Sequence, residues 1–249
     1  MATEAVVMDC PTERMAAFEV QQRFLEHWGP GIDTLDYSGQ CRQMRKVGGD
    51  FYHFVSLPED RLAVAIGDAS GKGFAAALMI ANVQSSLRTA TLFAGSDTAA
   101  ALEAVNHQLF GSSLASRYAT LFYGIYDGAT RSLHYVNAGQ NPPMVIRPNG
   151  SIVWLETGGA PVGLFPDSTY AEGTVQLQPG DTIVAYTDGV VEALNPDDRE
   201  WGTEGLRLAV RGAEAESAAG TVGAVMEAMR RFSHGCQMDD ATVVVVRVH

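Results

Sequence analysis

The sequence has few cysteines and no paired-thiol pattern. Cys10, Cys41 and Cys236 are odd in number, far apart and outside any CxxC motif. This arrangement disfavours a disulfide scaffold and a structural zinc site, and it is typical of a protein from a reducing cytoplasm. The six histidines are equally dispersed. Because no HxH or HExxH motif is present, the sequence does not support a histidine-based zinc centre.

Long apolar runs and basic patches are also missing. The N-terminus has no basic leader followed by an apolar stretch, which disfavours a signal peptide. The densest apolar helical segment, residues 74–81, is too short to cross a bilayer, so we expect no membrane association. The formal net charge is −12. We therefore expect no nucleic-acid partner, because binding to a phosphate backbone requires basic surfaces.

The composition is that of a globular protein. At 249 residues, with 46% hydrophobic and 18% charged residues, the chain can bury a substantial core without disulfides. Residues 12–28 predict an amphipathic helix. Its apolar face carries Phe18, Gln21, Phe24, Leu25 and Trp28. We expect residues 1–30 to form a helical leader that packs on the body, joins two copies as a homodimer or serves as a linker. We expect residues 31–249 to form one domain.

Short strand patterns follow one another through this domain. They cover residues 50–56, 61–67, 120–126, 133–137, 144–147, 152–155, 173–177, 182–186 and 241–248. The turn sequences PEDR, DGATR, PNG and QPGD predict hairpins, and hairpins imply antiparallel pairing. Helical patterns at residues 73–90, 97–110, 203–211 and 217–232 form two pairs. This order predicts an α+β sandwich with antiparallel sheets inside and helix pairs outside.

Aspartates stand at four ends of these apolar runs, three of them beside glycine. They are Asp50 in VGGDFYHF, Asp68 in LAVAIGDASGKG, Asp188 in TIVAYTDGVVEA, and Asp239 with its neighbour Asp240 in QMDDATVVVVRV. One such aspartate is most simply a turn residue, but four suggest that the fold gathers them. Gathered carboxylates repel each other and are costly to desolvate unless a cation joins them. Mg²⁺ and Mn²⁺ suit such oxygen ligands, and two ions together can activate water and clamp a phosphoryl group.

The other motifs in the sequence do not point to a different kind of site. The segment IGDASGKG has the wrong glycine spacing for a Walker A phosphate loop, but it can place Asp68 and the carbonyl of Ala69 side by side as ligands. No GxSxG nucleophile elbow is present. Glu192, Asp197 and Asp198 are better explained as a solvated acidic loop, since they lack the oxygen spacing of an EF-hand.

Six motifs in order give a family resemblance. VGGDFYHF, IGDASGKGFAAALM, AGQNPPMV, GAPVGLF, YTDGVVEA and DDATVVVVRV resemble the PP2C-type (PPM) metal-dependent serine/threonine phosphatases, and they are most similar to the bacterial SpoIIE/RsbU branch, over residues 47–248. The resemblance implies a four-layer αββα sandwich of two antiparallel sheets flanked by helix pairs. Two Mn²⁺ or Mg²⁺ ions would lie in a channel at one end.

The resemblance also implies a role for each aspartate. Asp68 would bridge both ions, with the carbonyl of Ala69 on the first. Asp188 and Asp239 would hold the second ion, and Asp50 would support the first. Asp240 stands where many relatives carry asparagine, so it ranks below Asp239 as a metal ligand.

The implied function is a cytoplasmic protein phosphatase that hydrolyses phosphoserine or phosphothreonine with a metal-activated water and no phosphoenzyme. The implied substrate is a STAS-type anti-sigma-factor antagonist. Three positions depart from common family patterns: Ser70 replaces a histidine proposed as the leaving-group acid, Gln140 replaces a histidine, and His53 replaces an aspartate. None of them removes an implied ligand.

Two alternatives share the same sequence features. One is a non-catalytic module that docks partners with a phosphatase fold, although retention of mutually repelling acids argues against it. The other is a hydrolase of small phosphoesters, which differs only in its substrate. A sensor domain usually precedes such a catalytic module. Because fewer than fifty residues precede it here, the sensor lies on another chain or this chain is part of a longer protein.

Overall fold

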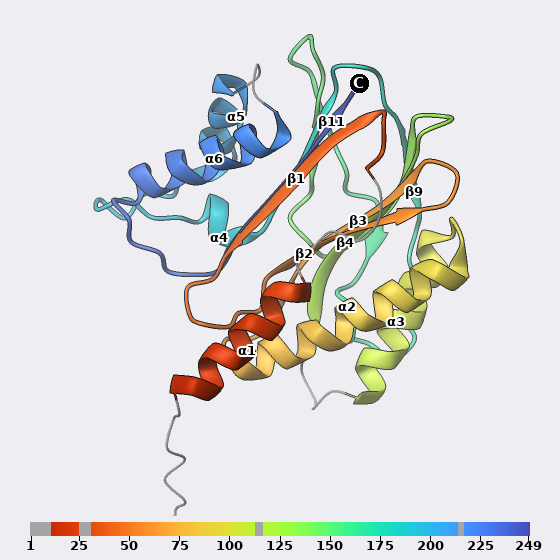
Figure 1. Ribbon diagram of the computed structural model, residues 1–249, viewed down its shortest axis with the longest axis horizontal. Coiled ribbons are helices and arrows are strands. Elements are labelled where there is room, and N and C mark those ends of the chain that lie inside the picture. Colours follow the sequence, from red (N-terminus) through yellow and green to blue (C-terminus); the bar gives the residue numbers. More distant parts are fainter. Residues whose placement is uncertain (1–10, 25–30, 113–116, 214–216) are drawn as a thin grey trace, which may run out of the picture.

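Two β-sheets lie face to face, and each carries a pair of helices on its outer side (Figure 1). The computed structural model describes residues 11–24, 31–112, 117–213 and 217–249. The four layers confirm the predicted αββα sandwich.

The two sheets are built from strands that are distant in sequence. The first has the spatial order β2 (Phe51–Leu57), β3 (Arg61–Ala69), β4 (Ala119–Asp127), β5 (Ser132–Ala138) and β8 (Gly158–Gly159), with β9 (Gly173–Gln176) also pairing with β5. The second has the order β1 (Leu35–Arg42), β11 (Ala241–Val248), β10 (Thr182–Tyr186), β6 (Met144–Ile146) and β7 (Ile152–Trp154). Pairing among the described residues is antiparallel except for the short parallel pair β5–β8.

Strand residues alternate between two apolar environments. In β4, Phe122 packs between the sheets and Tyr123 packs toward the helices on the outer face. In β11, Val244 and Val245 divide in the same way. Because both faces of the central strands are covered, these strands are apolar nearly throughout, although their neighbours are antiparallel.

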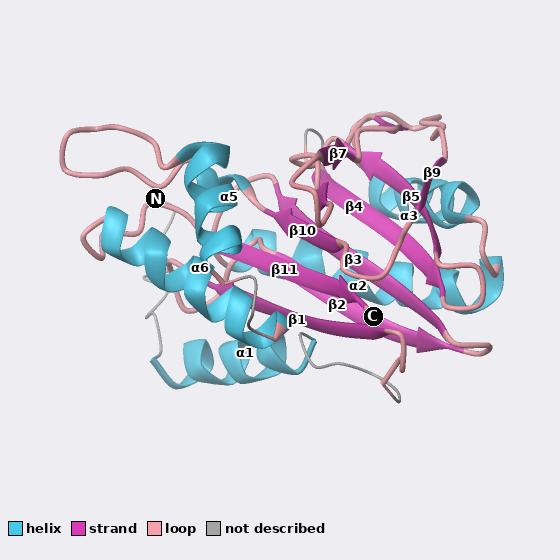
Figure 2. Cartoon of the chain, turned by 90° about the horizontal axis from the view of Figure 1, so that it is seen from above, coloured by secondary structure: helices cyan, strands magenta, loops and turns pink. Residues whose placement is uncertain are grey.

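The helix pairs complete the sandwich (Figure 2). Helices α2 (Phe74–Ala94) and α3 (Thr98–Ser112) cover the first sheet, and α5 (Gly202–Gly212) and α6 (Ala218–Phe232) cover the second. Asp97 caps α3, since its Oδ1 accepts the N–H of Ala100 at 2.8 Å. A short helix, α4 (Asp188–Val191), follows β10. None of the described helices has the length and apolarity needed to span a bilayer.

The predicted leader helix is present as α1 (Pro11–Phe24), which lies along α2 (Figure 1). The predicted face residues Leu25 and Trp28 lie outside the described residues, as do residues 1–10. Gln21 on α1 is buried and donates from Nε2 to the carbonyl of Gly48 at 2.8 Å. The leader is therefore joined to the loop that leads into β2, while its role in a homodimer stays a prediction.

Two features of the strand prediction are wrong. The turn QPGD does not close a hairpin, because it carries the chain from β9 in the first sheet to β10 in the second. Within it, Asp181 is fully buried, forms an ion pair with Arg147 and accepts the N–H of Gln178 at 2.7 Å, so a tight turn forms although the strands separate. Strand β1 was not predicted, because LDYSGQCR is polar and mostly half-buried at the sheet edge.

Candidate metal centre

The topology brings the predicted aspartates to one end of the sandwich. Phe51 pairs with Gly67, so Asp50, one residue before β2, adjoins Asp68 near the end of β3. In the second sheet, β10 ends where β11 begins, with Tyr186 opposite Val243. Asp188 follows β10 and Asp239 precedes β11, so both lie at the same end of their sheet. Residues from all parts of the chain thus meet at one rim.

Asp50 is a buried carboxylate held by two hydroxyls. It is 1% exposed, and its Oδ2 accepts hydrogen bonds from Thr187 Oγ1 and Thr242 Oγ1, each at 2.7 Å. Burial raises the pKa of Asp50 well above its ordinary value, the charge of Asp68 raises it further, and the two hydroxyls act in the opposite direction. The second sheet therefore orients a carboxylate that belongs to the first.

Asp68 lies at the centre of the negative charge. Burial is the main cause that raises its pKa to about 7, and Asp188, Asp239 and Asp240 add to the shift. A Cβ at Gly49 would lie 2.9 Å from Asp68 Oδ1 and 3.1 Å from the carbonyl oxygen of Ala69. Both oxygens thus approach the same point, and any side chain at Gly49 would occupy it.

Asp188 and Asp239 come from two loops in direct contact. Asp188 begins α4, and its Oδ1 accepts the N–H of Gly189 at 2.7 Å. Burial raises the pKa of Asp188, and the charge of Asp239 adds to this effect. A Cβ at Gly189 would lie 1.9 Å from the carbonyl oxygen of Asp240 and 3.3 Å from Asp239 Cβ. Only glycine therefore lets these loops approach so closely.

Asp239 already holds a cation, the ammonium group of Lys72. Lys72 Nζ lies 2.5 Å from Asp239 Oδ2, and the Asp239 side chain is 43% exposed. The hydrogen bond to Asp239 is the main cause that raises the pKa of Lys72. Lys72 belongs to the GKG segment, which does not have the spacing of a phosphate loop. Its contact with Asp239 places this lysine at the edge of the aspartate cluster.

Asp240 holds the loop between β1 and β2 through two hydrogen bonds. Its Oδ1 accepts the N–H of Met44 at 2.7 Å, and its Oδ2 accepts the N–H of Gly49 at 2.9 Å. Gln21 holds the same loop from the other side, because its Oε1 accepts the N–H of Gly48 at 3.2 Å. The segment that leads into Asp50 is thus anchored at both β11 and α1.

The donor set fits hard divalent cations. It consists of carboxylates and one backbone carbonyl, which are the ligands that Mg²⁺ and Mn²⁺ prefer. In the described part of the chain, no three acidic, histidine or cysteine side chains already stand close enough together to form a metal group. The ammonium on Asp239 and the raised pKa of Asp68 are both signs that the cluster favours a cation.

Sequence reasoning missed the polar residues that support the aspartates. Thr187 precedes Asp188 in YTDG, and Thr242 follows Asp240 by two residues in DDAT. For Thr242, a hydroxyl inside a valine-rich strand was the available signal. Gln140, which departs from the family pattern, is buried and bridges the sheets. It accepts from Thr120 Oγ1 and donates from Nε2 to the carbonyl of Tyr186 at 3.1 Å. Ser70, which also departs from the family pattern, accepts the backbone N–H of Tyr118 with its Oγ at 3.0 Å.

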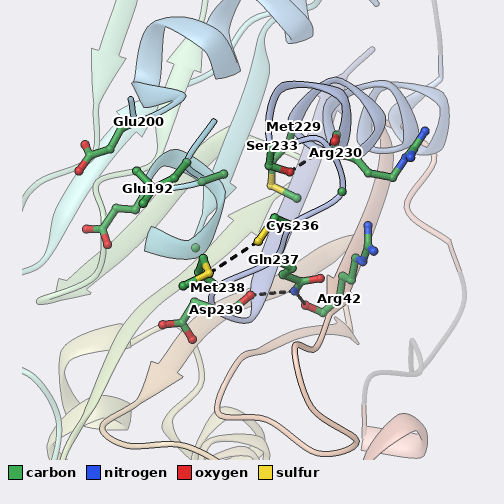
Figure 3. Close-up of a pocket in the computed structure, with 14 residues that line it drawn as sticks. Arg42, Glu192, Glu200, Met229, Arg230, Ser233, Cys236, Gln237, Met238 and Asp239 are labelled. Carbon is green, nitrogen blue, oxygen red and sulfur yellow. Dashed lines mark hydrogen bonds between the residues drawn. The ribbon is translucent and has the colours of Figure 1, made fainter. Parts of the chain in front are cut away.

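A cleft of about 220 Å³ opens beside Asp239 (Figure 3). It lies between the α4 segment and the end of α6. Its charged lining is mixed and consists of Arg42, Glu192, Glu200, Arg230 and Asp239. The loop before β11 is fixed here, because Gln237 Nε2 donates to the carbonyls of Arg42 at 2.7 Å and Asp239 at 2.8 Å. Glu192, which was predicted to be solvated, is exposed at this cleft, and Asp197 and Asp198 are also exposed.

Comparisons with known proteins give consistent relatives. The family model described as Stage II sporulation protein E (SpoIIE) matches residues 58–249. The chain is 29% identical over 219 residues to Protein IcfG of Synechocystis sp., covering 76% of this chain and 34% of that protein. It is 28% identical over 188 residues to Phosphoserine phosphatase RsbU of Bacillus subtilis, covering 75% of this chain and 56% of that protein. The matches thus span between a third and just over half the length of these two relatives.

Solved structures agree on the fold. The SiaA-PP2C domain of Pseudomonas aeruginosa superposes with a TM-score of 0.83 at 19% identity, covering 96% of both chains. The PP2C phosphatase domain of SpoIIE from Bacillus subtilis, solved with a fragment of its regulatory domain, has a TM-score of 0.73 at 23% identity and covers 86% of this chain and 63% of that one. The sandwich is therefore PP2C-like, and with a family model matched over most of its length the chain belongs to the SpoIIE family.

Proposed function

We propose that the chain is a protein serine/threonine phosphatase that uses two Mn²⁺ or Mg²⁺ ions. The observation that carries this proposal is the gathering of Asp50, Asp68, Asp188 and Asp239 at one end of a PP2C-like sandwich. Burial, followed by the charges of Asp188, Asp239 and Asp240, raises the pKa of Asp68 there to about 7. Membership of the SpoIIE family supports the proposal, as do the relatives RsbU and RsbP of Bacillus subtilis, both named phosphoserine phosphatases.

In this proposal each aspartate keeps the role that the family resemblance implied. Asp68 would be shared by the two ions, Asp50 and the carbonyl of Ala69 would hold the first, and Asp188 and Asp239 would hold the second. When bound, the ions activate water for in-line attack on phosphorus and neutralise the phosphate oxygens.

The surrounding residues keep the carboxylates ionised and in place. A carboxylate must lose its proton to bind a metal ion. The hydroxyls of Thr187 and Thr242 favour the ionised form of the buried Asp50. Both Asp240 oxygens accept backbone N–H groups, so we assign Asp240 to positioning the Gly49–Asp50 segment rather than to metal binding. A divalent ion on Asp239 would compete with the ammonium of Lys72.

We further propose that the substrate is a phosphorylated STAS-type anti-sigma-factor antagonist in the cytoplasm. The support is the resemblance to RsbU-like proteins and the 28% identity to RsbU itself.

The test measures phosphate release from a phosphorylated STAS-type protein, a phosphoserine peptide and p-nitrophenyl phosphate. Each is assayed with Mn²⁺ and again with EDTA, for the wild type, Asp68→Asn and the control Asp97→Asn. Asp97 only caps α3, and asparagine caps equally well. We expect EDTA and Asp68→Asn to abolish turnover and Asp97→Asn to retain it.

Other outcomes would overturn the proposal. Turnover that survives both EDTA and Asp68→Asn would exclude a mechanism that depends on this metal centre. Metal binding without turnover of any substrate would indicate a docking module. Turnover of p-nitrophenyl phosphate alone would indicate a hydrolase of small phosphoesters.

A further inference from the structure

A basic pocket of about 480 Å³ lies beside the carboxylates. Its lining includes Arg14, Arg45, Lys46 and Lys72. The whole chain has a net charge of −12 and only two lysines, and both of them are in this pocket. Four cationic side chains are thus grouped at one place on an acidic protein, where they can attract an anionic partner.

Three separate parts of the fold supply these cations. Arg14 comes from α1, Arg45 and Lys46 from the segment between β1 and β2, and Lys72 from the loop between β3 and α2. The ammonium of Lys46 lies 5.8 Å from the centre of the Phe18 ring, a cation–π distance that links it to α1. Arg45 Nη1 lies 3.6 Å from where a Cβ at Gly73 would stand. Arg45, Lys46 and Arg14 are all exposed to solvent.

Two residues that line the pocket connect it to the proposed metal centre. Lys72 lines the pocket and contacts Asp239 at 2.5 Å. Val47 also lines it and immediately precedes the Gly48–Gly49–Asp50 segment that Gln21 and Asp240 anchor. A polypeptide whose phosphorylated side chain reaches the carboxylates therefore brings its neighbouring residues next to these cations.

We propose that this basic pocket binds acidic side chains that flank the phosphorylated residue of the protein substrate. The inference rests on the proposed phosphatase function and adds to it a preference for acidic sequence. Exposed opposite charges contribute modestly to affinity, but they attract the correct partner and repel others. The pocket suits a short acidic segment rather than a nucleic acid, because the rest of this acidic chain would repel an extended phosphate backbone. In the cleft of Figure 3, arginines stand together with acidic side chains, so its charge is mixed.

The test uses two fluorescent phosphoserine peptides that differ only in their flanks, aspartate and glutamate in one, serine and glutamine in the other. Binding is measured by anisotropy and kcat/KM by phosphate release with Mn²⁺, for the wild type, Lys46→Glu and Arg14→Glu. Arg211→Glu, an exposed arginine on α5, is the matched control. We expect the wild type and control to favour the acidic peptide by about 5- to 20-fold, since one exposed ion pair contributes up to roughly fivefold.

Each charge reversal in the pocket should reduce this preference to about twofold or less, and 0.5 M salt should do the same in the wild type through screening. A wild type that binds both peptides equally, a preference that both reversals leave intact, or tighter binding of single-stranded DNA than of the acidic peptide would overturn the proposal. Flank-dependent binding without turnover would instead refute the phosphatase and leave the pocket standing.

Discussion

Replacing Thr242 by valine removes one of the two hydroxyls that hold the buried Asp50. Valine has nearly the same shape as threonine, so the main change is the loss of the 2.7 Å hydrogen bond to Asp50 Oδ2. Hydrogen bonds to charged groups contribute about 1.5–3 kcal/mol. Loss of this donor raises the pKa of Asp50 further, because the hydroxyl opposes the effect of burial. The protonated carboxyl then competes with metal binding.

We expect the Thr242→Val variant to bind Mn²⁺ more weakly and therefore to need a higher Mn²⁺ concentration for the same activity. Because Thr187 keeps its own 2.7 Å bond to the same oxygen, we take the lower part of the range. The Mn²⁺ concentration for half-maximal phosphate release should rise roughly 10- to 30-fold, and saturating Mn²⁺ should restore most of the activity. The assay is a Mn²⁺ titration of phosphopeptide turnover.

Thr91→Val is the matched control. Thr91 on α2 is 3% exposed, and its hydroxyl contacts the hydroxyl of Tyr123 on β4 at 2.9 Å, so its loss also removes a buried hydrogen bond. This control should lower the melting temperature without changing the Mn²⁺ dependence. Equal Mn²⁺ dependence of Thr242→Val, Thr91→Val and the wild type would refute the reasoning, since Asp50 would then not depend on its hydroxyl partners.

Three further predictions concern the same rim of the sandwich. In EDTA, stability should fall as the pH rises from about 4 to about 7, because folded Asp68 keeps its proton to about pH 7 whereas the unfolded carboxyl ionises near 3.8. The melting temperature should drop by roughly 10 °C over this range. Mn²⁺ should remove the effect, and a flat profile in EDTA would contradict it. Gln21→Leu leaves the N–H and the carbonyl of Gly48 without their side-chain partner. It should lower the free energy of unfolding by about 1–3 kcal/mol and raise the Mn²⁺ concentration needed for activity. Denaturant melts and a Mn²⁺ titration check this, and unchanged values would show that α1 does not position this loop. Gly189→Ala forces a Cβ within 1.9 Å of a backbone oxygen and should abolish Mn²⁺ binding. The control Gly223→Ala on α6, where a Cβ has nothing within 4 Å, should bind Mn²⁺ normally and be slightly more stable. Titration calorimetry compares the two variants, and normal Mn²⁺ binding by Gly189→Ala would contradict the packing argument.

The strands that sequence reasoning predicted are those with an apolar pattern to detect. Strand β11 is buried over nearly its whole length, and its predicted bounds match the structure. Strand β1 pairs with it over eight residues, yet its polar sequence gives no such pattern because it lies at the sheet edge. The turn QPGD shows a second limit. The turn itself forms as its sequence predicts. Whether the flanking strands β9 and β10 belong to one sheet depends on packing far from the turn.

The aspartates were predictable because each interrupts or ends a strand pattern, whereas their supporting partners were not. Thr187 and Thr242 lie 137 and 192 residues from Asp50 in sequence. Their contact depends on how one sheet stacks on the other, which no local pattern encodes. The same holds for Gln21, which appeared as one member of a helix face but in the structure bonds to Gly48.

The number of divalent ions that the chain binds tests the central claim most directly. Isothermal titration of the EDTA-treated wild type with Mn²⁺ should show two bound ions. Asp68→Asn should lose at least the tighter site, because it removes the carboxylate proposed to bridge both. Asp97→Asn should bind like the wild type. Undiminished binding of both ions by Asp68→Asn, or no binding by the wild type, would contradict the proposal that these aspartates gather to hold a pair of metal ions.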